Sequence, residues 1–181
     1  FMQIPSMNNH QISWGKQFKE IFDRGEKNYQ SGDRVASSFF SNEETTFLAS
    51  IGCKPQELFD FVEDQCNYGE PDFETVLQVA AIRNRYLREI QNGIASNVEI
   101  PSSQLPAKTK AMDGIPWLPR IIAKARAKMR GELDQNTMYG CGGDRSFLAS
   151  NGLTLPEFLE IVWKAGDDNQ IILEAVRSGL K

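Results

Sequence analysis

The sequence Phe-Leu-Ala-Ser-Ile-Gly at residues 47–52 returns as Phe-Leu-Ala-Ser-Asn-Gly at residues 147–152, an offset of 100 positions. The same offset joins identical residues on both sides of this motif without a gap: Ile21 and Ile121, Glu57 and Glu157, Val62 and Val162. Apolar residues before the motif recur every three or four positions in both halves, which is the period of an amphipathic helix. The chain therefore contains an internal duplication of a helical unit.

Two copies are too few for a solenoid, which needs at least three repeats to bury a continuous core. We therefore predict an all-α fold of two tandem pseudo-repeated helical bundles, with about four helices each, packed with approximate twofold pseudo-symmetry. The expected segments are an N-terminal tail at 1–13, repeat 1 at 14–95, a linker at 96–114 and repeat 2 at 115–181. The linker is assigned because its stretch holds prolines, serines and few apolar residues.

Each copy is predicted to contain one helix before the motif, a short helix that carries it, and two helices after it. The expected bounds are 15–31, 42–51, 55–66 and 71–91 in the first copy, and 116–131, a short helix ending at Gly152, 155–165 and a helix from 168 in the second. Ser41 and Glu44 have the spacing of a capping box at the start of the first short helix. No segment shows a sustained alternation of apolar and polar residues, so no strand is predicted.

The composition is that of a globular protein, with 181 residues, 40% hydrophobic and 24% charged, and a formal net charge of −4. No apolar run is long enough to span a bilayer, and the polar start of the chain, where Phe1 before Met2 looks like an expression scar, lacks the pattern of a signal peptide. Three irregularly spaced cysteines fit reduced thiols. We therefore expect a soluble cytoplasmic protein that binds no membrane, and the acidic balance argues against nucleic acid as a partner.

Several types of catalytic and metal site lack the residues they need. The only histidine, His10, lies in the polar tail, which excludes Ser-His-Asp and Cys-His catalysis and histidine-rich zinc sites. Cys53 and Cys66 have no Cys-x-x-Cys partner. Neighbouring carboxylates such as Glu43 and Glu44 point apart on a helix, so no local acid–base pair is present, although a pair assembled across the fold stays open. We expect no metal and no cofactor.

The first helix of repeat 2 is strongly basic. It carries no acidic residue, and its cations follow two ridges beside the apolar stripe: Arg120, Lys124 and Lys128 on one, Arg126 and Arg130 on the other. Long basic side chains commonly extend along the flanks of a buried stripe into solvent. The alternative is a binding site for phosphate, a nucleotide or another small anion, formed by Arg120, Lys124, Arg126, Lys128 and Arg145.

A glycine-rich loop, Tyr-Gly-Cys-Gly-Gly-Asp-Arg, occupies residues 139–145. Glycines let the backbone approach a ligand closely and leave the thiol of Cys141 accessible, with Arg145 placed to stabilise its thiolate, so an enzyme that uses Cys141 or Asp144 is one interpretation. The other is a tight turn in which Asp144 caps the short helix and Cys141 is a small apolar filler. The loop lacks the Gly-Lys-Ser/Thr ending of a phosphate-binding loop, and a nucleophilic cysteine normally needs a histidine base.

Repeat 2 also resembles a known family. The matching motifs are Trp-Leu-Pro-Arg at 117–120, Lys-Ala-Arg-Ala at 124–127, Asp-Arg-x-Phe-Leu at 144–148, Gly152, and Glu-Phe at 157–158. These residues are similar to a bacterial family described as domain of unknown function 5069. The resemblance implies that repeat 2 has the typical form of the family and that repeat 1, which lacks the Leu-Pro-Arg and Asp-Arg pieces, has diverged. It implies no activity.

Because catalytic motifs are missing and duplicated units form interfaces, our leading hypothesis is a non-enzymatic binding or interaction module. Its partner would be a protein or a small anionic ligand bound in the groove between the copies, and a homodimer is compatible with such a module. One alternative is an anion- or nucleotide-binding protein that uses the basic helix of repeat 2. The other is an enzyme with its site at Cys141 and Asp144.

Overall fold

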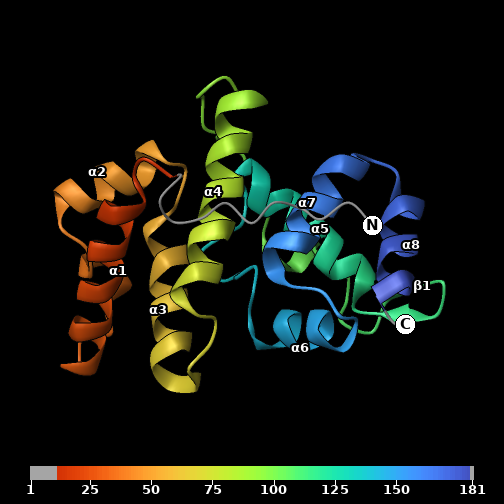
Figure 1. The fold of residues 1–181 in the computed structure, drawn as a ribbon, viewed down its shortest axis with the longest axis horizontal. Coiled ribbons are helices and arrows are strands. Elements are labelled where there is room, and N and C mark those ends of the chain that lie inside the picture. The colour runs from red at the N-terminus through yellow and green to blue at the C-terminus, as the bar shows by residue number, and fades with distance from the viewer. Residues whose placement is uncertain (1–11, 180–181) are drawn as a thin grey trace. The chain divides into compact units, whose positions relative to one another are not determined.

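The computed structural model describes residues 12–179, and the chain divides into two compact units, unit 1 (Phe1–Gly93) and unit 2 (Ile94–Lys181) (Figure 1). The described residues form eight α-helices, two 3-10 turns and one two-stranded sheet, so the prediction of a helical fold is confirmed apart from this sheet. No helix in this range is both long and apolar enough to cross a lipid bilayer. His10 and the predicted tail up to residue 11 lie outside the described residues.

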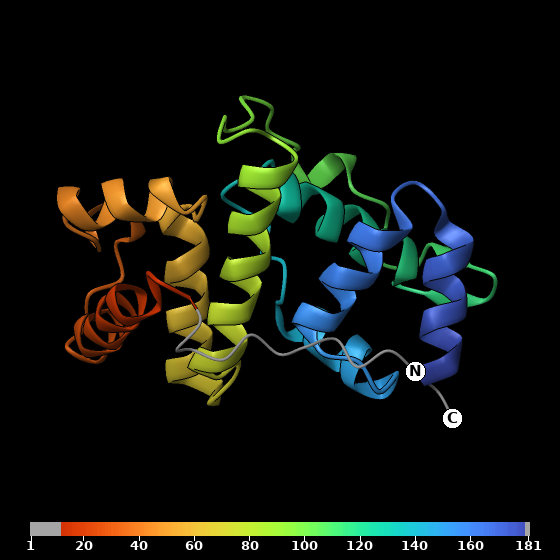
Figure 2. The same ribbon diagram turned by 45° about the horizontal axis from the view of Figure 1, so that its top comes forward.

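Unit 1 contains four α-helices arranged around α3. In chain order the elements are α1 (Gly15–Gln30), the 3-10 turn η2 (Ala36–Ser38), α2 (Asn42–Ser50), α3 (Pro55–Tyr68) and α4 (Phe73–Glu89). Helix α3 packs against α1, α2 and η2, while α4 packs against α1 (Figures 1 and 2). The bounds agree with the predicted helices to within one or two residues at each end.

Local sequence explains where the helices of unit 1 begin and end. Ser41 forms the predicted capping box before α2: its hydroxyl accepts from the backbone N–H of Glu44 at 3.2 Å, and the Glu44 carboxylate accepts from the N–H of Ser41 at 2.6 Å. Gly52 follows α2 with a φ of 79°, a left-handed conformation that glycine adopts without strain. Asp72 caps α4 by accepting from the N–H of Thr75 at 2.9 Å.

The core of unit 1 lies between α1, α3 and α4. Its fully buried apolar side chains include Phe18, Ile21, Phe22, Leu58, Val62, Val76 and Leu77. Burying one side chain of this size contributes roughly 1.5–3 kcal/mol relative to leaving it exposed. A Cβ at Gly25 would lie 3.1 Å from Cγ2 of Val62 and 3.3 Å from the ring of Phe39, so the absence of a side chain allows α1 to approach α3 closely.

Unit 2 contains four α-helices arranged around α7. Its elements are η3 (Ser102–Gln104), β1 (Ala111–Met112), β2 (Ile115–Pro116), α5 (Leu118–Arg130), α6 (Gly142–Ser150), α7 (Leu155–Ala165) and α8 (Asn169–Gly179). Helix α7 packs against α5, α6 and α8. Thr154 and Glu157 form a capping box at the start of α7, and the carboxylate of Asp168 accepts from the N–H of Gln170 at the start of α8 at 2.9 Å.

The sheet of unit 2 departs from the sequence prediction and moves the start of α5. The antiparallel register pairs Ala111 with Pro116 and Met112 with Ile115. Asp113 and Gly114 join the strands with φ values of 50° and 80°, and two left-handed residues are what a type I′ hairpin turn requires. The predicted helix from 116 is therefore wrong at its start: Pro116 lies in β2, and α5 begins at Leu118 with Pro119 in its first turn.

The segment predicted as a linker, residues 96–114, makes several contacts within unit 2. The backbone N–H of Ile100 donates to the carbonyl oxygen of Glu132 at 2.8 Å, and the N–H of Ser102 donates to the carboxylate of Asp134 at 3.0 Å. Leu105 is buried. These contacts attach the segment to the chain that follows α5.

Candidate functional site

A buried group of charged and polar side chains joins α5 to α6, and we call Trp117, Lys124, Cys141 and Asp144 the α5–α6 cluster. Trp117 immediately precedes α5, Lys124 lies within α5, and the glycine-rich loop places Cys141 and Asp144 at the start of α6. Lys124 and Asp144 form an ion pair whose side chains are 3% and 0% exposed. Charges this deeply buried require good partners, because their desolvation is costly.

Both carboxylate oxygens of Asp144 accept hydrogen bonds from the chain itself. Oδ1 accepts from the indole N–H of Trp117 at 2.9 Å, and Oδ2 accepts from the backbone N–H of Gly140 at 2.9 Å and from the ammonium of Lys124. Burial raises the pKa of Tyr139 well above its ordinary value, and the charge of the nearby Asp144 raises it further. Three donors around one buried carboxylate support a structural role for Asp144.

Cys141 occupies the N-cap position of α6, and its side chain is half-buried. The ammonium of Lys124 lies 3.4 Å from its sulfur, and Arg145 donates to the carbonyl oxygen of Gly140 at 2.7 Å. The predicted cap of α6 by Asp144 is wrong, because Asp144 is the third helical residue and its carboxylate is held by donors from α5 and the loop. The loop nevertheless brings Cys141, Lys124 and Arg145 together.

The packing of Trp117 explains why α6 has a glycine at position 143. Trp117 has a φ of 69°, a left-handed value that is rare for a large side chain. This conformation accompanies an indole that covers the start of α6: a Cβ added at Gly143 would lie 2.6 Å from Cζ2 of the indole ring. A Cβ at Gly142 would meet only the guanidinium of Arg145, at 3.8 Å. The lack of a side chain at Gly143 therefore makes room for the tryptophan.

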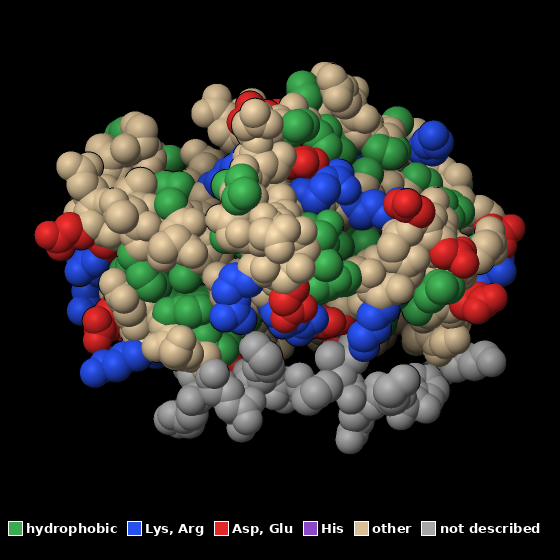
Figure 3. All heavy atoms as spheres, turned by 90° about the horizontal axis from the view of Figure 1, so that it is seen from above, with side chains coloured by type: hydrophobic (Ala, Val, Ile, Leu, Met, Phe, Trp, Pro, Cys, Tyr) green, Lys and Arg blue, Asp and Glu red, His purple; other side chains and the backbone are tan. Residues whose placement is uncertain are grey.

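The other cations predicted to form an anion site are used within the fold. Lys124 and Arg145 lie at the glycine-rich loop, whereas Arg120 and Arg126 donate to backbone carbonyl oxygens elsewhere, at 2.8 Å and 2.7 Å. Lys128 is only 3% exposed. On the face shown in Figure 3, basic and acidic side chains lie in small mixed groups rather than in one continuous basic field.

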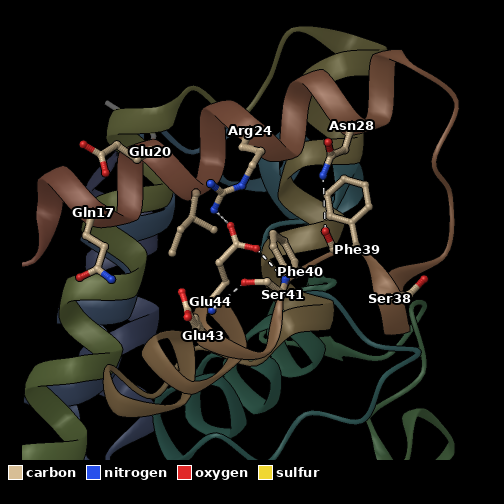
Figure 4. A pocket seen from close by; sticks show the side chains of 11 residues that line it. Gln17, Glu20, Arg24, Asn28, Ser38, Phe39, Phe40, Ser41, Glu43 and Glu44 are labelled. Carbon is tan, nitrogen blue, oxygen red and sulfur yellow. Dashed lines mark hydrogen bonds and ion pairs between the residues drawn. The ribbon is translucent and has the colours of Figure 1, made fainter.

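Unit 1 has a pocket between α1 and the start of α2, which we call the α1–α2 pocket (Figure 4). Its volume is about 580 Å³, inside the range of roughly 300–1,000 Å³ that is common for small-molecule sites. The lining residues are Gln17, Glu20, Ile21, Arg24, Asn28, Ser38, Phe39, Phe40, Ser41, Glu43 and Glu44. Figure 4 shows Arg24 extending from α1 toward Glu44 at the beginning of α2.

An ion pair between Arg24 and Glu44 crosses this pocket. The side chain of Arg24 is 54% exposed, whereas that of Glu44 is 10% exposed. The second carboxylate oxygen of Glu44 accepts from the N–H of Ser41 in the capping box. The amide of Asn28 donates to the carbonyl oxygen of Phe39 at 3.5 Å. The guanidinium is thus accessible from the pocket while the carboxylate is fixed at the helix start.

Two further carboxylates, Glu20 and Glu43, line the pocket and are exposed to solvent. Within residues 12–179 neither of them has an ion pair or a side-chain hydrogen bond. The lining therefore holds three carboxylates against the single guanidinium of Arg24, and the pocket carries a negative charge.

Among the described residues, the cysteines and carboxylates do not gather into a metal site. Residues 12–179 contain no group of three or more His, Cys, Asp or Glu side chains that could hold a metal ion. Cys53 is buried, and all three cysteines are free thiols. Burial raises the pKa of the Cys66 thiol, the charge of Glu26 raises it further, and Arg34 opposes this effect.

Residues 103–180 match the model of a protein family described as Domain of unknown function (DUF5069). This part of the chain, which is less than half of its length, is similar to that family. The matched residues include the α5–α6 cluster and all four α-helices of unit 2, which confirms the resemblance seen in the sequence motifs. Searches of curated proteins and of solved structures found no match. The description of the DUF5069 family states no activity, so a function has to rest on the sites themselves.

Neither the α1–α2 pocket nor the role of Trp117 was predicted from the sequence. The offset of 100 residues contained a signal, because Arg24 and Glu44 stand 100 positions before Lys124 and Asp144. Two oppositely charged pairs that recur at one sequence offset predict the same kind of contact between the first and second helices of each unit. The sequence offset does not indicate which of the two ion pairs is exposed to solvent.

Proposed function

We propose that this protein is a non-enzymatic binding module whose ligand is a small molecule with an ammonium or guanidinium group, bound in the α1–α2 pocket. The observation that carries the proposal is the lining charge, with Glu20, Glu43 and Glu44 opposed only by Arg24. Attraction between opposite charges is stronger in a partly enclosed pocket than in bulk water. A cation that enters between the two exposed carboxylates gains this attraction.

The remaining lining groups suit the same ligand. An ammonium donates three hydrogen bonds and accepts none, so it needs oxygen acceptors around it. The pocket offers carboxylate oxygens and the side-chain oxygens of Gln17 and Ser41. Phe39 and Phe40, both largely buried, provide apolar surface for the carbon chain of the ligand.

We also propose that the two units derive from one duplicated helical unit and have diverged at this position. Both units have four α-helices in the same order, and α2 and α6 start 100 residues apart. Residues paired by the offset are buried in both units: Ile21 and Ile121, Leu48 and Leu148, Val62 and Val162. In unit 2 the position between the first two helices is filled by Trp117, which supports a structural use there and ligand binding in unit 1.

The other expectations from the sequence stay predictions. They are the twofold packing of the two halves, a ligand or protein partner bound between them, and a homodimer. An anion site on α5 and an enzyme that uses Cys141 also stay alternatives, and the contact between Lys124 and Cys141 is compatible with thiol chemistry.

Isothermal titration of the full chain with cadaverine and with glutarate tests the proposal, because the two probes have chains of the same length and opposite charges. Cadaverine should bind and glutarate should not, at low ionic strength where charge attraction is least screened. Replacing both Glu20 and Glu43 with Gln should weaken cadaverine binding about tenfold, since each exposed charge pair contributes up to about 1 kcal/mol.

Glu174→Gln is the matched control, because Glu174 is an exposed carboxylate on α8 and lines no part of the pocket. This variant should bind cadaverine as the parent protein does. Equal binding of glutarate and cadaverine, or an equal loss in the control and the double variant, would contradict the proposal.

A further inference from the structure

A second pocket of unit 1 lies between the end of α2 and α4, and we call it the α2–α4 pocket. Its volume is about 390 Å³, and its lining residues are Ile12, Ser13, Trp14, Phe47, Ser50, Ile51, Ala81, Asn84, Arg85 and Arg88. The pocket shares no lining residue with the α1–α2 pocket. The two pockets are therefore separate sites, and a ligand of one does not depend on a ligand of the other.

The charge of the α2–α4 pocket is opposite to that of the α1–α2 pocket. Arg85 and Arg88 are its charged lining residues, and no carboxylate lines it. Arg88 is exposed and forms no ion pair within residues 12–179. Arg85 lies 3.9 Å from the carboxylate of Glu89 and also takes part in a further interaction, so the charge open to a ligand is that of Arg88. The pocket is thus positively charged and favours an anion.

Asn84 supplies an independent sign of a ligand. The residue is only 8% exposed, and within residues 12–179 its side-chain amide has no hydrogen-bond partner. Neither polar atom of the Asn84 side chain is among the buried atoms that lack a partner, so the amide keeps contact with the water of the pocket. An unpaired amide that lines a pocket is suited to a hydrogen bond with a bound molecule.

The walls of the pocket suit an aromatic ring. Trp14 and Phe47 line it, each half-buried, and Ile51 and Ala81 add buried apolar surface. Aromatic side chains contribute large contact areas and favour edge-to-face or offset contacts with other rings. Apolar walls with a few convergent polar groups are the usual composition of a small-molecule site.

We infer that the α2–α4 pocket binds a small aromatic carboxylate. The ring lies against Trp14 and Phe47, the carboxylate pairs with Arg88, and the amide of Asn84 forms a hydrogen bond with the ligand. Guanidinium groups bind carboxylates with planar, paired hydrogen bonds, which gives the site its preference for this group.

Titration of the full chain with phenylacetate and phenethylamine tests this inference, because the two probes share a ring and differ in the sign of their charge. Nuclear magnetic resonance reports on the site directly through the indole N–H of Trp14 and the amide of Asn84. Phenylacetate should shift both signals at concentrations at which phenethylamine does not. Preference for phenethylamine, or no binding of phenylacetate, would overturn the inference.

Two variants separate a binding role of these residues from a merely structural one. Asn84→Leu should weaken phenylacetate binding about tenfold. The melting temperature of the free variant shows whether it folds. Unchanged phenylacetate binding by a folded Asn84→Leu variant, or unchanged binding by Arg88→Glu, would overturn the inference.

Arg88→Glu keeps the test valid if the Asn84 variant fails to fold, because Arg88 is exposed and its replacement leaves the core intact. Reversal of this charge should weaken phenylacetate binding about tenfold. The matched control is Arg177→Glu, which changes an exposed arginine on α8 that does not line the pocket. It should leave phenylacetate binding unchanged, and an equal loss in both variants would show that the probe responds only to overall charge.

Discussion

The ion pairs Lys124–Asp144 and Arg24–Glu44 stand 100 residues apart in the chain and differ in their exposure to water. In unit 2 the two side chains are 3% and 0% exposed, whereas in unit 1 they are 54% and 10% exposed. The ion pair between α5 and α6 in unit 2 is thus buried, whereas the ion pair between α1 and α2 in unit 1 is part of an open pocket. The pair in unit 1 is better suited to ligand binding, because its charges are accessible to solvent. The buried pair in unit 2 offers no free donor or acceptor to a ligand.

The two ion pairs differ in exposure because the units have different residues near the beginning of their first helix. Trp117 stands before α5 in a left-handed conformation, donates to Asp144 and covers Gly143. Its counterpart at the offset of 100 residues is Gln17, which lies inside α1 and lines the pocket without a comparable ring. Trp117, which follows the hairpin directly, therefore covers the ion pair region in unit 2, and unit 1 has no such side chain at the corresponding position.

Loss of the buried carboxylate should have the largest effect of the substitutions that probe this comparison. Asp144→Asn leaves the ammonium of Lys124 buried without a counter-charge, which should cost about 3–5 kcal/mol of unfolding free energy. The corresponding change in unit 1, Glu44→Gln, should cost about 1 kcal/mol or less because Arg24 stays solvated. Urea unfolding followed by tryptophan fluorescence measures both.

Similar losses in these two variants would break the comparison, because they would show that burial does not distinguish the two ion pairs. Replacing Trp14 with Phe in each variant assigns the loss to its unit, because the remaining tryptophans, Trp117 and Trp163, both belong to unit 2. The Asp144 variant should shift mainly the transition seen by these two tryptophans.

Neighbouring glycines test whether Trp117 closes the site in unit 2. Gly143→Ala places a methyl group against the indole and should cost about 2 kcal/mol, as overpacking commonly does. Gly142→Ala meets no such obstacle and should be neutral or stabilising by up to about 1 kcal/mol, since alanine favours a helix over glycine. Thermal unfolding and the near-ultraviolet circular dichroism of the tryptophan report both effects.

Gly142→Ala controls for the loss of backbone freedom, because both glycines lie in the first turn of α6. Equal stability of the two alanine variants would show that the indole is not packed against Gly143. Another residue would then have to exclude water from the α5–α6 cluster.

The sequence predicted the helices well because their signals are local. The motif at 47–52, the capping box of Ser41 and the helix periodicity place most helix ends within one or two residues. The hairpin before α5 was missed even though its turn, Asp113 and Gly114, has a strong local signal. Strands of two residues each are too short to show alternation, so only the turn could have revealed them.

The candidate sites were less predictable, because they depend on which side chains meet across helices. A row of cations on α5 reads as a basic face, yet the structure holds Lys124 against Asp144 and buries Lys128. Each pocket of unit 1 is lined by residues from two helices, α1 and α2 in one case and α2 and α4 in the other. No local sequence motif predicts which helices pack together. Asn84 looks like an ordinary helix residue until its burial and missing partner are known.

A smaller effect concerns the charge balance of α3 in unit 1. Burial is the main cause that raises the pKa of Asp60 from 3.8 to about 6; the hydrogen bond from Gln56 lowers it, and the charges of Glu63, Asp64 and Glu57 raise it. The folded protein therefore binds this proton more tightly than the unfolded chain does. The resulting stability is present below about pH 4 and is lost as the pH rises through about 6.

Asp60→Asn should accordingly stabilise the protein by about 1 kcal/mol at pH 8 and have almost no effect at pH 4, because asparagine resembles the protonated acid. Urea unfolding at the two pH values measures the difference, with Asp167→Asn as an exposed control that should change neither value. A gain of the same size at both pH values would point to packing rather than charge. A gain confined to pH 8 would show that unit 1 carries uncompensated negative charge on α3 as well as in the α1–α2 pocket, and that the contrast with the ion-paired cluster of unit 2 extends beyond a single ion pair.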